Sequence, residues 1–364
     1  MKIKKLLAQV HLWIGLILGL LFFLISLSGA IYTWAPEISA IIYKQKVEQK
    51  SEPFVLTSTI KTTLDREFPE GDFRTVFFRD NTQAIEVLLY GQGTYYYAYL
   101  NPYTGALIHI QDMNKGWLNY TKFIHRNLLL GKVGQQIVHW VTLLFLIMTI
   151  TGIIMWWPVN KGGTKKVLTI KLSSSPKKLN YDLHNVLGFY ASWVLIFCII
   201  TGLFWGFKVV KDTFRLATGE NELTYDIPLS EKEGSQSNLD QFVLMDSLAL
   251  VYRTKYPNEF VRISNPHKET DPIRVVVISP DRSSNKTQHF YFDRYSGDRI
   301  NGNFEYGLQA EASMFNTING LVYDIHFGTV LGLTGRLLVF FASLIAASLP
   351  VTGFIIWFGK RKKA

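Results

Sequence analysis

The sequence predicts a membrane α-helical protein: a bundle of four transmembrane helices, built from two repeats, with two extracytoplasmic α+β modules. Three observations lead to this prediction. Four long stretches carry no Asp, Glu, Lys or Arg, basic residues gather in the short segments beside those stretches, and the two halves of the chain repeat each other. Only 18% of the residues are charged, against about 25% in an ordinary soluble domain.

The four uncharged stretches are 6–36, 133–160, 183–207 and 337–359. Each exceeds the roughly 20 apolar residues that a helix needs to cross a bilayer, and the first is too long for the h-region of a cleaved signal peptide. Tryptophans near their ends are typical of the membrane interface. We therefore expect transmembrane helices at 6–36, 133–158, 183–207 and 331–359, separated by an outer module (37–132), a cytoplasmic loop (159–182) and a second outer module (208–330).

The charge distribution predicts the orientation. The N-terminal segment, the loop between the second and third spans and the C-terminal tail hold thirteen basic residues and one acidic residue, Asp182, a balance of +12. The rest of the chain holds 25 basic and 27 acidic residues, a balance of −2. Because basic loops stay inside, we expect both termini and the short loop in the cytoplasm and the two outer modules on the far side of the membrane. The net charge of +10 then reflects topology beside membrane lipid, and no nucleic-acid partner is expected.

Identities at fixed offsets indicate an internal duplication. At an offset of 173 residues, His11, Gly15 and Ser28-Gly29 match His184, Gly188 and Thr201-Gly202. At an offset of 201 residues, His125, Gly131, Gly134 and Thr151-Gly152 match His326, Gly332, Gly335 and Thr352-Gly353. Each half therefore reads as helix, outer module, helix.

The two outer modules share one predicted order of elements. In the first module we expect a helix at 58–68, strands at 73–78, 84–89 and 95–100, and a turn at 101–105. In the second we expect a helix at 240–256, strands near 260–263, 273–279 and 288–292, and a turn at 293–297. Proline and glycine occupy the positions that turns favour in the first turn, and glycine ends the second.

Five of the eight histidines lie in or beside the spans: His11, His125, His139, His184 and His326. Ionisable groups at membrane depth are costly and are functional by default, and a neutral imidazole is a usual protein ligand of haem iron. A single such histidine is more often an interfacial residue bonded to backbone or lipid. Two duplicated pairs favour ligation instead, and repeat symmetry predicts two bis-histidine sites, His11 with His184 and His125 with His326.

Other residues near these pairs are candidate cofactor contacts. Gly15 and Gly188 follow the first pair by one helical turn, where they give a flat macrocycle room or allow close helix packing. Arg126, with its neighbour Lys122, and Arg336 lie near the second pair, where they pair with propionates or an anionic chelate, or snorkel to the interface.

His139 has no histidine counterpart, because residue 340 at the offset of 201 is a phenylalanine. Three roles stay open for it: replacing His125 as a ligand, moving protons, or bonding to a propionate. His109, His267 and His289 lie in the outer modules, and no two of them show ligand spacing, so we expect structural or solvated roles there.

The motifs also resemble a known family. The letters HLWIG at 11–15, NPYTG at 101–105, FIHRNLLLG at 123–131 and TGIIMWWP at 151–158 are similar to those of the PepSY-associated transmembrane family. The resemblance covers nearly the whole chain and implies that the outer modules are PepSY-like. Some members are haem-containing inner-membrane reductases of ferric siderophores. It therefore implies a bacterial inner-membrane protein with cytoplasmic termini and periplasmic modules. It also implies that two haem b groups carry electrons from a cytoplasmic reductant or quinol to a periplasmic ferric siderophore or other ferric chelate.

The sequence is also compatible with two other functions. One is a non-redox, membrane-anchored PepSY interaction or regulatory protein, and the other is an electron-transfer subunit for a separate periplasmic reductase. The sequence has no P-loop, no dinucleotide-binding motif and no HExxH, so ATP is not the energy source and the electron donor is a separate molecule. A single cysteine, Cys198, excludes CxxC sites and covalent c-type haem attachment. Catalytic residues are not predicted.

Overall fold

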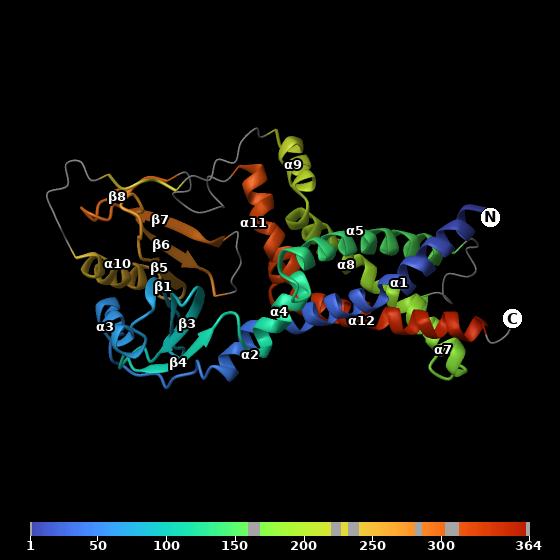
Figure 1. Ribbon diagram of the computed structural model, residues 1–364, viewed down its shortest axis with the longest axis horizontal. Helices are drawn as coiled ribbons and strands as arrows, with labels where there is room; N and C mark the ends of the chain where they lie inside the picture. Colours follow the sequence, from blue (N-terminus) through green and yellow to red (C-terminus); the bar gives the residue numbers. More distant parts are fainter. Residues whose placement is uncertain are drawn as a thin grey trace. The chain divides into compact units, whose positions relative to one another are not determined.

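The computed structural model describes residues 2–158, 168–219, 227–231, 240–280, 286–302 and 313–361. The chain divides into two compact units, each described by itself. The first comprises 1–34, 120–214 and 325–364, and the second comprises 35–119 and 215–324. In Figure 1 the four long helices belong to the first unit, and the sheet with the helices packed on it belongs to the second. Five basic residues used to predict the orientation lie outside the described residues: Lys161, Lys165, Lys166, Lys362 and Lys363.

Four long helices make up the first unit: α1 (Lys2–Tyr32), α5 (Gly131–Trp156), α8 (Gly188–Gly206) and α12 (Gly332–Arg361). Within the described residues, four helical segments are long and apolar enough to cross a membrane, namely Ile3–Tyr32, Gly131–Trp156, Pro176–Gly206 and Thr329–Gly359. The four predicted spans are therefore confirmed as helices of membrane-crossing length and composition. Two shorter helices, α2 (Ala35–Ile42) and α9 (Lys208–Ala217), follow the ends of α1 and α8.

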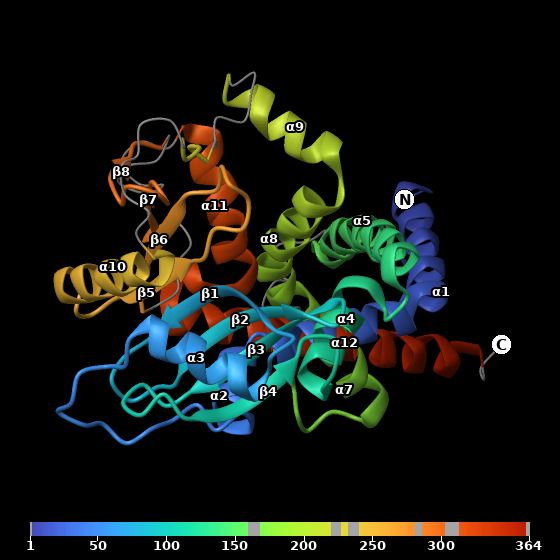
Figure 2. The same ribbon diagram turned by 60° about the vertical axis from the view of Figure 1, so that its left-hand side comes forward.

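The four long helices pack side by side, α1 against α5 and α12, and α8 against the same two helices (Figures 1 and 2). Leu195 and Ile199 of α8 are buried against Ala342 and Ala346 of α12. Lipid tails are as apolar as leucine, so small residues that let helices approach closely stabilise such a bundle. The alanines of α12 serve this purpose.

A tight corner precedes both α5 and α12. The short helices α4 (Trp117–Asn127) and α11 (Met314–Phe327) end just before them. A Cβ atom at Gly134 would overlap the backbone oxygen of Asn127, and one at Gly335 would overlap the backbone oxygen of Gly328. Gly328 itself has a φ of 77°, which favours glycine. These contacts explain why glycine recurs here at an offset of 201.

The second unit holds one eight-stranded antiparallel sheet in the order β4-β3-β2-β1-β5-β6-β7-β8. Its strands are β1 (Asp72–Phe78), β2 (Ile85–Gly91), β3 (Thr94–Leu100), β4 (Leu107–Asp112), β5 (Phe260–Ser264), β6 (Ile273–Ile278), β7 (Gln288–Phe292) and β8 (Arg299–Ile300). Six of them match the predicted strands, whereas β4 and β8 were not predicted.

The two expected modules form one continuous sheet. Strand β1 pairs with β5, from Thr75 opposite Ser264 to Phe78 opposite Val261. Each of these strands would otherwise be an exposed edge with unpaired backbone groups, and edge-to-edge pairing satisfies both at once. Strands from two separate stretches of the chain, 72–112 and 260–300, therefore share a single sheet.

Helices α3 (Thr57–Glu67) and α10 (Gln241–Lys255) contact each other and pack on one face of the sheet (Figure 2). Ile60, Leu64 and Met245 are fully buried in this core. Asp246 of α10 accepts hydrogen bonds from the backbone nitrogen and the hydroxyl of Ser58, at 3.2 and 2.6 Å. A carboxylate at the first turn of α3 also interacts favourably with the helix dipole.

The two predicted turns have the same hydrogen-bond pattern. Asn101 Oδ1 accepts from the backbone nitrogens of Tyr103 and Thr104, at 2.9 and 3.1 Å. Asp293 Oδ1 accepts from the backbone nitrogens of the second and third residues after it, both at 2.8 Å. Each turn ends in a glycine with positive φ, Gly105 and Gly297. These side-chain caps are what Asn and Asp supply in turns.

The corner before α12 gives a stability prediction. Gly335→Ala places a methyl group on the Gly328 carbonyl, and we expect a loss of about 1–3 kcal/mol of folding free energy from overpacking. Thermal unfolding in detergent measures this loss. Gly359→Ala is the matched control, because it changes a glycine of the same helix with no heavy atom within 4 Å of the new Cβ. Equal unfolding midpoints for the two variants would contradict the interpretation.

Candidate functional site: two histidine pairs

The first histidine pair joins α1 to the start of α8. His11 lies in α1, and His184 lies in a π-helical turn, η2 (Leu183–Leu187), between α7 (Pro176–Asp182) and α8. The centroids of the two imidazole rings are 6.5 Å apart, and the ring planes are at 85°. Single π-turns inside helices are frequent at functional sites.

The second histidine pair joins α4 to α11. The ring centroids of His125 and His326 are 6.0 Å apart and their planes are at 63°. The ring of Trp205, from α8, lies 5.1 Å from that of His326. The structure thus places together the same two pairs that repeat symmetry predicted from the sequence.

The ring separations fit two imidazoles on opposite sides of one metal ion. A metal–imidazole bond of about 2.0–2.1 Å, with the ring centre about 1.1 Å behind the nitrogen, would put two rings that share one metal ion about 6.2–6.4 Å apart, close to the 6.5 and 6.0 Å of the two pairs. Among the described residues, no group of three or more His, Cys, Asp or Glu is arranged to hold a metal ion. Two histidines are the number of protein ligands that a metal would need if it brought its other ligands with it, as haem iron does.

Each of the four paired histidines makes a hydrogen bond through Nδ1 to a different long helix. His11 bonds to Thr151 Oγ1 at 3.0 Å, and His184 bonds to Thr352 Oγ1 at 2.9 Å. His326 bonds to Thr201 Oγ1 at 2.8 Å. His125 bonds to the backbone oxygen of Ile25 at 2.8 Å.

These hydrogen bonds favour one tautomer of the histidines. The hydroxyl of Thr151 donates its single hydrogen to the Met148 backbone oxygen at 3.0 Å, so its oxygen accepts from His11. The hydroxyls of Thr352 and Thr201 likewise donate to carbonyls three residues earlier, at 3.1 and 2.9 Å. The carbonyl of Ile25 only accepts. With the hydroxyls donating to these carbonyls, Nδ1 carries the proton in all four histidines, which leaves the Nε2 lone pair for a metal, as in metal-binding histidines generally.

A glycine lies beside each of the four paired rings. It follows the threonine partner of His11, His184 and His326, and it follows Ser28 beside His125. A Cβ atom at Gly152 would lie 3.3 Å from His11 Cε1, and one at Gly353 would lie 3.2 Å from His184 Cε1. At Gly29 and Gly202 the distances are 2.8 Å to His125 Cε1 and 3.9 Å to His326 Cε1. A Ser/Thr-Gly dipeptide, one in each long helix, is therefore the surface on which each histidine packs.

Sequence reasoning found these dipeptides as repeat identities but missed their role. It instead singled out Gly15 and Gly188, whose added Cβ atoms would lie 3.2 Å from Met148 Cε and 3.5 Å from Leu349 Cδ2. Both glycines therefore lie at helix–helix contacts, which agrees with the packing alternative. One sequence signal could have revealed this role. The Ser/Thr-Gly dipeptides repeat at the same two offsets, 173 and 201, as the paired histidines.

The remaining predicted site residues lie in different surroundings. The ring of His139 lies 6.0 Å from that of Phe207, and its carbon atoms lie 3.0 Å from an added Cβ at Gly206. Arg126 is exposed on α4. Arg336 donates to the backbone oxygen of Thr33 at 2.9 Å and lies 4.6 Å above the ring of Trp34, so it caps the C-terminal end of α1.

A bundle of four apolar helices with two internal pairs of imidazoles defines a multi-span membrane protein with two candidate histidine sites. The chain belongs to the family described as the PepSY-associated TM region, whose model matches residues 8–360. This range contains all five histidines of the spans and all four Ser/Thr-Gly dipeptides. No curated protein matches the chain.

Proposed function

We propose that this protein carries electrons across the bacterial inner membrane through two haem b groups, one held by His11 and His184 and one held by His125 and His326. The observation that supports this most strongly is the geometry of the pairs. Both ring separations, 6.5 and 6.0 Å, suit bis-histidine ligation, and the hydrogen bonds at Nδ1 leave all four Nε2 atoms available.

The chain's own residues orient and insulate the two sites. When bound, a haem supplies reversible one-electron transfer. Thr151, Thr352 and Thr201 hold the imidazole tautomer, and the surrounding apolar helices keep out water. Along α1, the contacts of the two pairs, at His11 and Gly29, are separated by about 27 Å at 1.5 Å per residue. Two sites at this spacing divide the crossing of the membrane into shorter steps.

The proposed electron acceptor is a ferric siderophore or another ferric chelate in the periplasm. One electron, supplied by a cytoplasmic reductant or a quinol, converts Fe(III) in the chelate to Fe(II). Oxygen-rich chelators hold Fe(II) less tightly, so reduction favours release of the iron. In this proposal the positive-inside distribution of charge places the His11–His184 pair near the cytoplasm and the second unit, with its PepSY-like halves, in the periplasm.

Removal of single histidines tests the assignment of the two pairs. We expect the purified protein to show haem absorbance, His11→Ala and His125→Ala each to lose about half of it, and His139→Ala to keep all of it, because the structure pairs His125 with His326. Absorption spectra normalised to protein measure this. A colourless protein from haem-replete cells would favour a non-redox interaction protein and overturn the proposal, as would loss of both haems in each histidine variant.

The hydroxyl partners give a second prediction. Thr151→Val removes the acceptor of the His11 Nδ1 proton without a large change in shape, and loss of such a partner typically weakens metal binding about 10–100-fold. We expect faster loss of one haem to apomyoglobin and a shifted midpoint potential. Thr149→Val is the matched control, since Thr149 also donates to a backbone oxygen of α5, at 2.9 Å, and contacts no paired histidine. Equal effects of the two variants would contradict the assigned role.

A further inference from the structure

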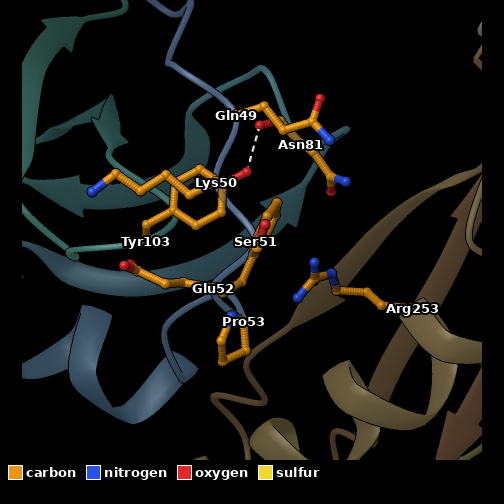
Figure 3. Close-up of a pocket in the computed structure, with 9 residues that line it drawn as sticks. Gln49, Lys50, Ser51, Glu52, Pro53, Asn81, Tyr103 and Arg253 are labelled. Carbon is orange, nitrogen blue, oxygen red and sulfur yellow. Dashed lines mark hydrogen bonds between the residues drawn. The ribbon is translucent and has the colours of Figure 1, made fainter.

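A cavity of about 580 Å³ lies in the second unit, away from the histidine pairs along the sequence. It is lined by the segment 49–54, which precedes α3, and by Asn81, Tyr103 and Arg253 (Figure 3). These residues come from both halves of the shared sheet unit. The volume is within the range of about 300–1,000 Å³ that is usual for small-molecule sites.

Arg253 of α10 lines this cavity, and its guanidinium packs over two aromatic rings. Its guanidinium carbon lies 3.7 Å from the ring centre of Phe54 and 5.3 Å from that of Phe78. Stacking on aromatic faces uses the flat face of a guanidinium and leaves its N–H edges free to donate in the plane. In Figure 3 the guanidinium points toward Ser51 and into the cavity.

No carboxylate among the described residues pairs with Arg253. The side chain is half-buried, and within the same described part of the chain it has neither an ion pair nor a hydrogen-bond acceptor. Burial removes water from the cation and lowers the pKa of Arg253 to about 10. A partly buried cation without a partner is unfavourable, and an anionic ligand relieves that cost.

The rest of the cavity lining offers donors and little competing negative charge. Lys50 is exposed at its edge, and the Tyr103 hydroxyl donates to the Asn81 backbone oxygen at 2.7 Å, which ties two lining segments together. Glu52 supplies the acid of the lining, and Figure 3 shows its carboxylate directed away from Arg253. The lining therefore carries two cations for one anion.

We propose that this cavity binds a small carboxylate anion, with the carboxylate held in the plane of the Arg253 guanidinium. Paired N–H donors match the two oxygens of a carboxylate in a fork-to-fork arrangement. Lys50 adds positive charge at the entrance, and Ser51 adds a hydroxyl beside the guanidinium. The inference does not depend on haem, because it rests on residues of the second unit alone.

Titration calorimetry of the full-length protein in detergent, with citrate as the probe at low salt, tests the proposal. We expect binding of citrate and no binding of triethyl citrate, which has the same skeleton without the charges. Arg253→Gln should weaken citrate binding about tenfold or more, the size of a lost charged hydrogen-bond pair. Arg253→Lys should restore part of it, because it keeps the charge and loses the fork.

Two controls keep the outcome interpretable. Arg66→Gln removes an exposed cation of α3 in the same unit and should leave citrate affinity unchanged. The thermal midpoint of each variant, with and without citrate, separates loss of binding from loss of folding, because a bound ligand raises the midpoint of a folded protein. Absence of citrate binding to the unmodified protein, or equal affinity in folded Arg253→Gln, would overturn the proposal.

Discussion

The interaction on which the rest of the structure depends is the hydrogen bond from a histidine Nδ1 to a neighbouring long helix. Four imidazoles lie inside or beside an apolar bundle, where an unsatisfied polar group costs several kcal/mol. The three threonines and the Ile25 carbonyl remove that cost. Because each bond joins two helices, it also restrains their rotation and register, and it holds the rings of each pair 6.0–6.5 Å apart.

The positions of the glycines follow from the same need to bring a histidine ring close to a helix backbone. A ring packs against a helix backbone only where no side chain intervenes, as at Gly152 and Gly353. Similarly, α4 and α11 turn back against α5 and α12 only because Gly134 and Gly335 allow backbone contact. The repeated sequence identities therefore mark two physical requirements, an acceptor for Nδ1 and space for the ring or the corner. In the proposed function these requirements prepare bis-histidine sites before any cofactor binds.

Much of this architecture follows from local sequence signals, and the remainder depends on contacts between distant residues. Charge-free length predicts the spans, and the repeat offsets predict that His11 meets His184. The hydrogen bond of His11 to Thr151 joins residues 140 positions apart, so no local pattern reveals it. Strand β8 has only two residues, too few for an alternating pattern, and the pairing of β1 with β5 arises when two edges meet. The π-turn at His184 likewise has no recognisable signature in the sequence.

Electron transfer across a sealed bilayer tests the central proposal most directly. The protein is reconstituted in liposomes that enclose a membrane-impermeant reductant, a ferric chelate is added outside, and Fe(II) outside is measured with an impermeant colorimetric ligand. The account predicts Fe(II) formation that requires the protein and is abolished by His11→Ala and by His125→Ala, since each removes one of the two sites. Fe(II) formation at the same rate in both histidine variants, or none with the haem-loaded protein, would contradict it.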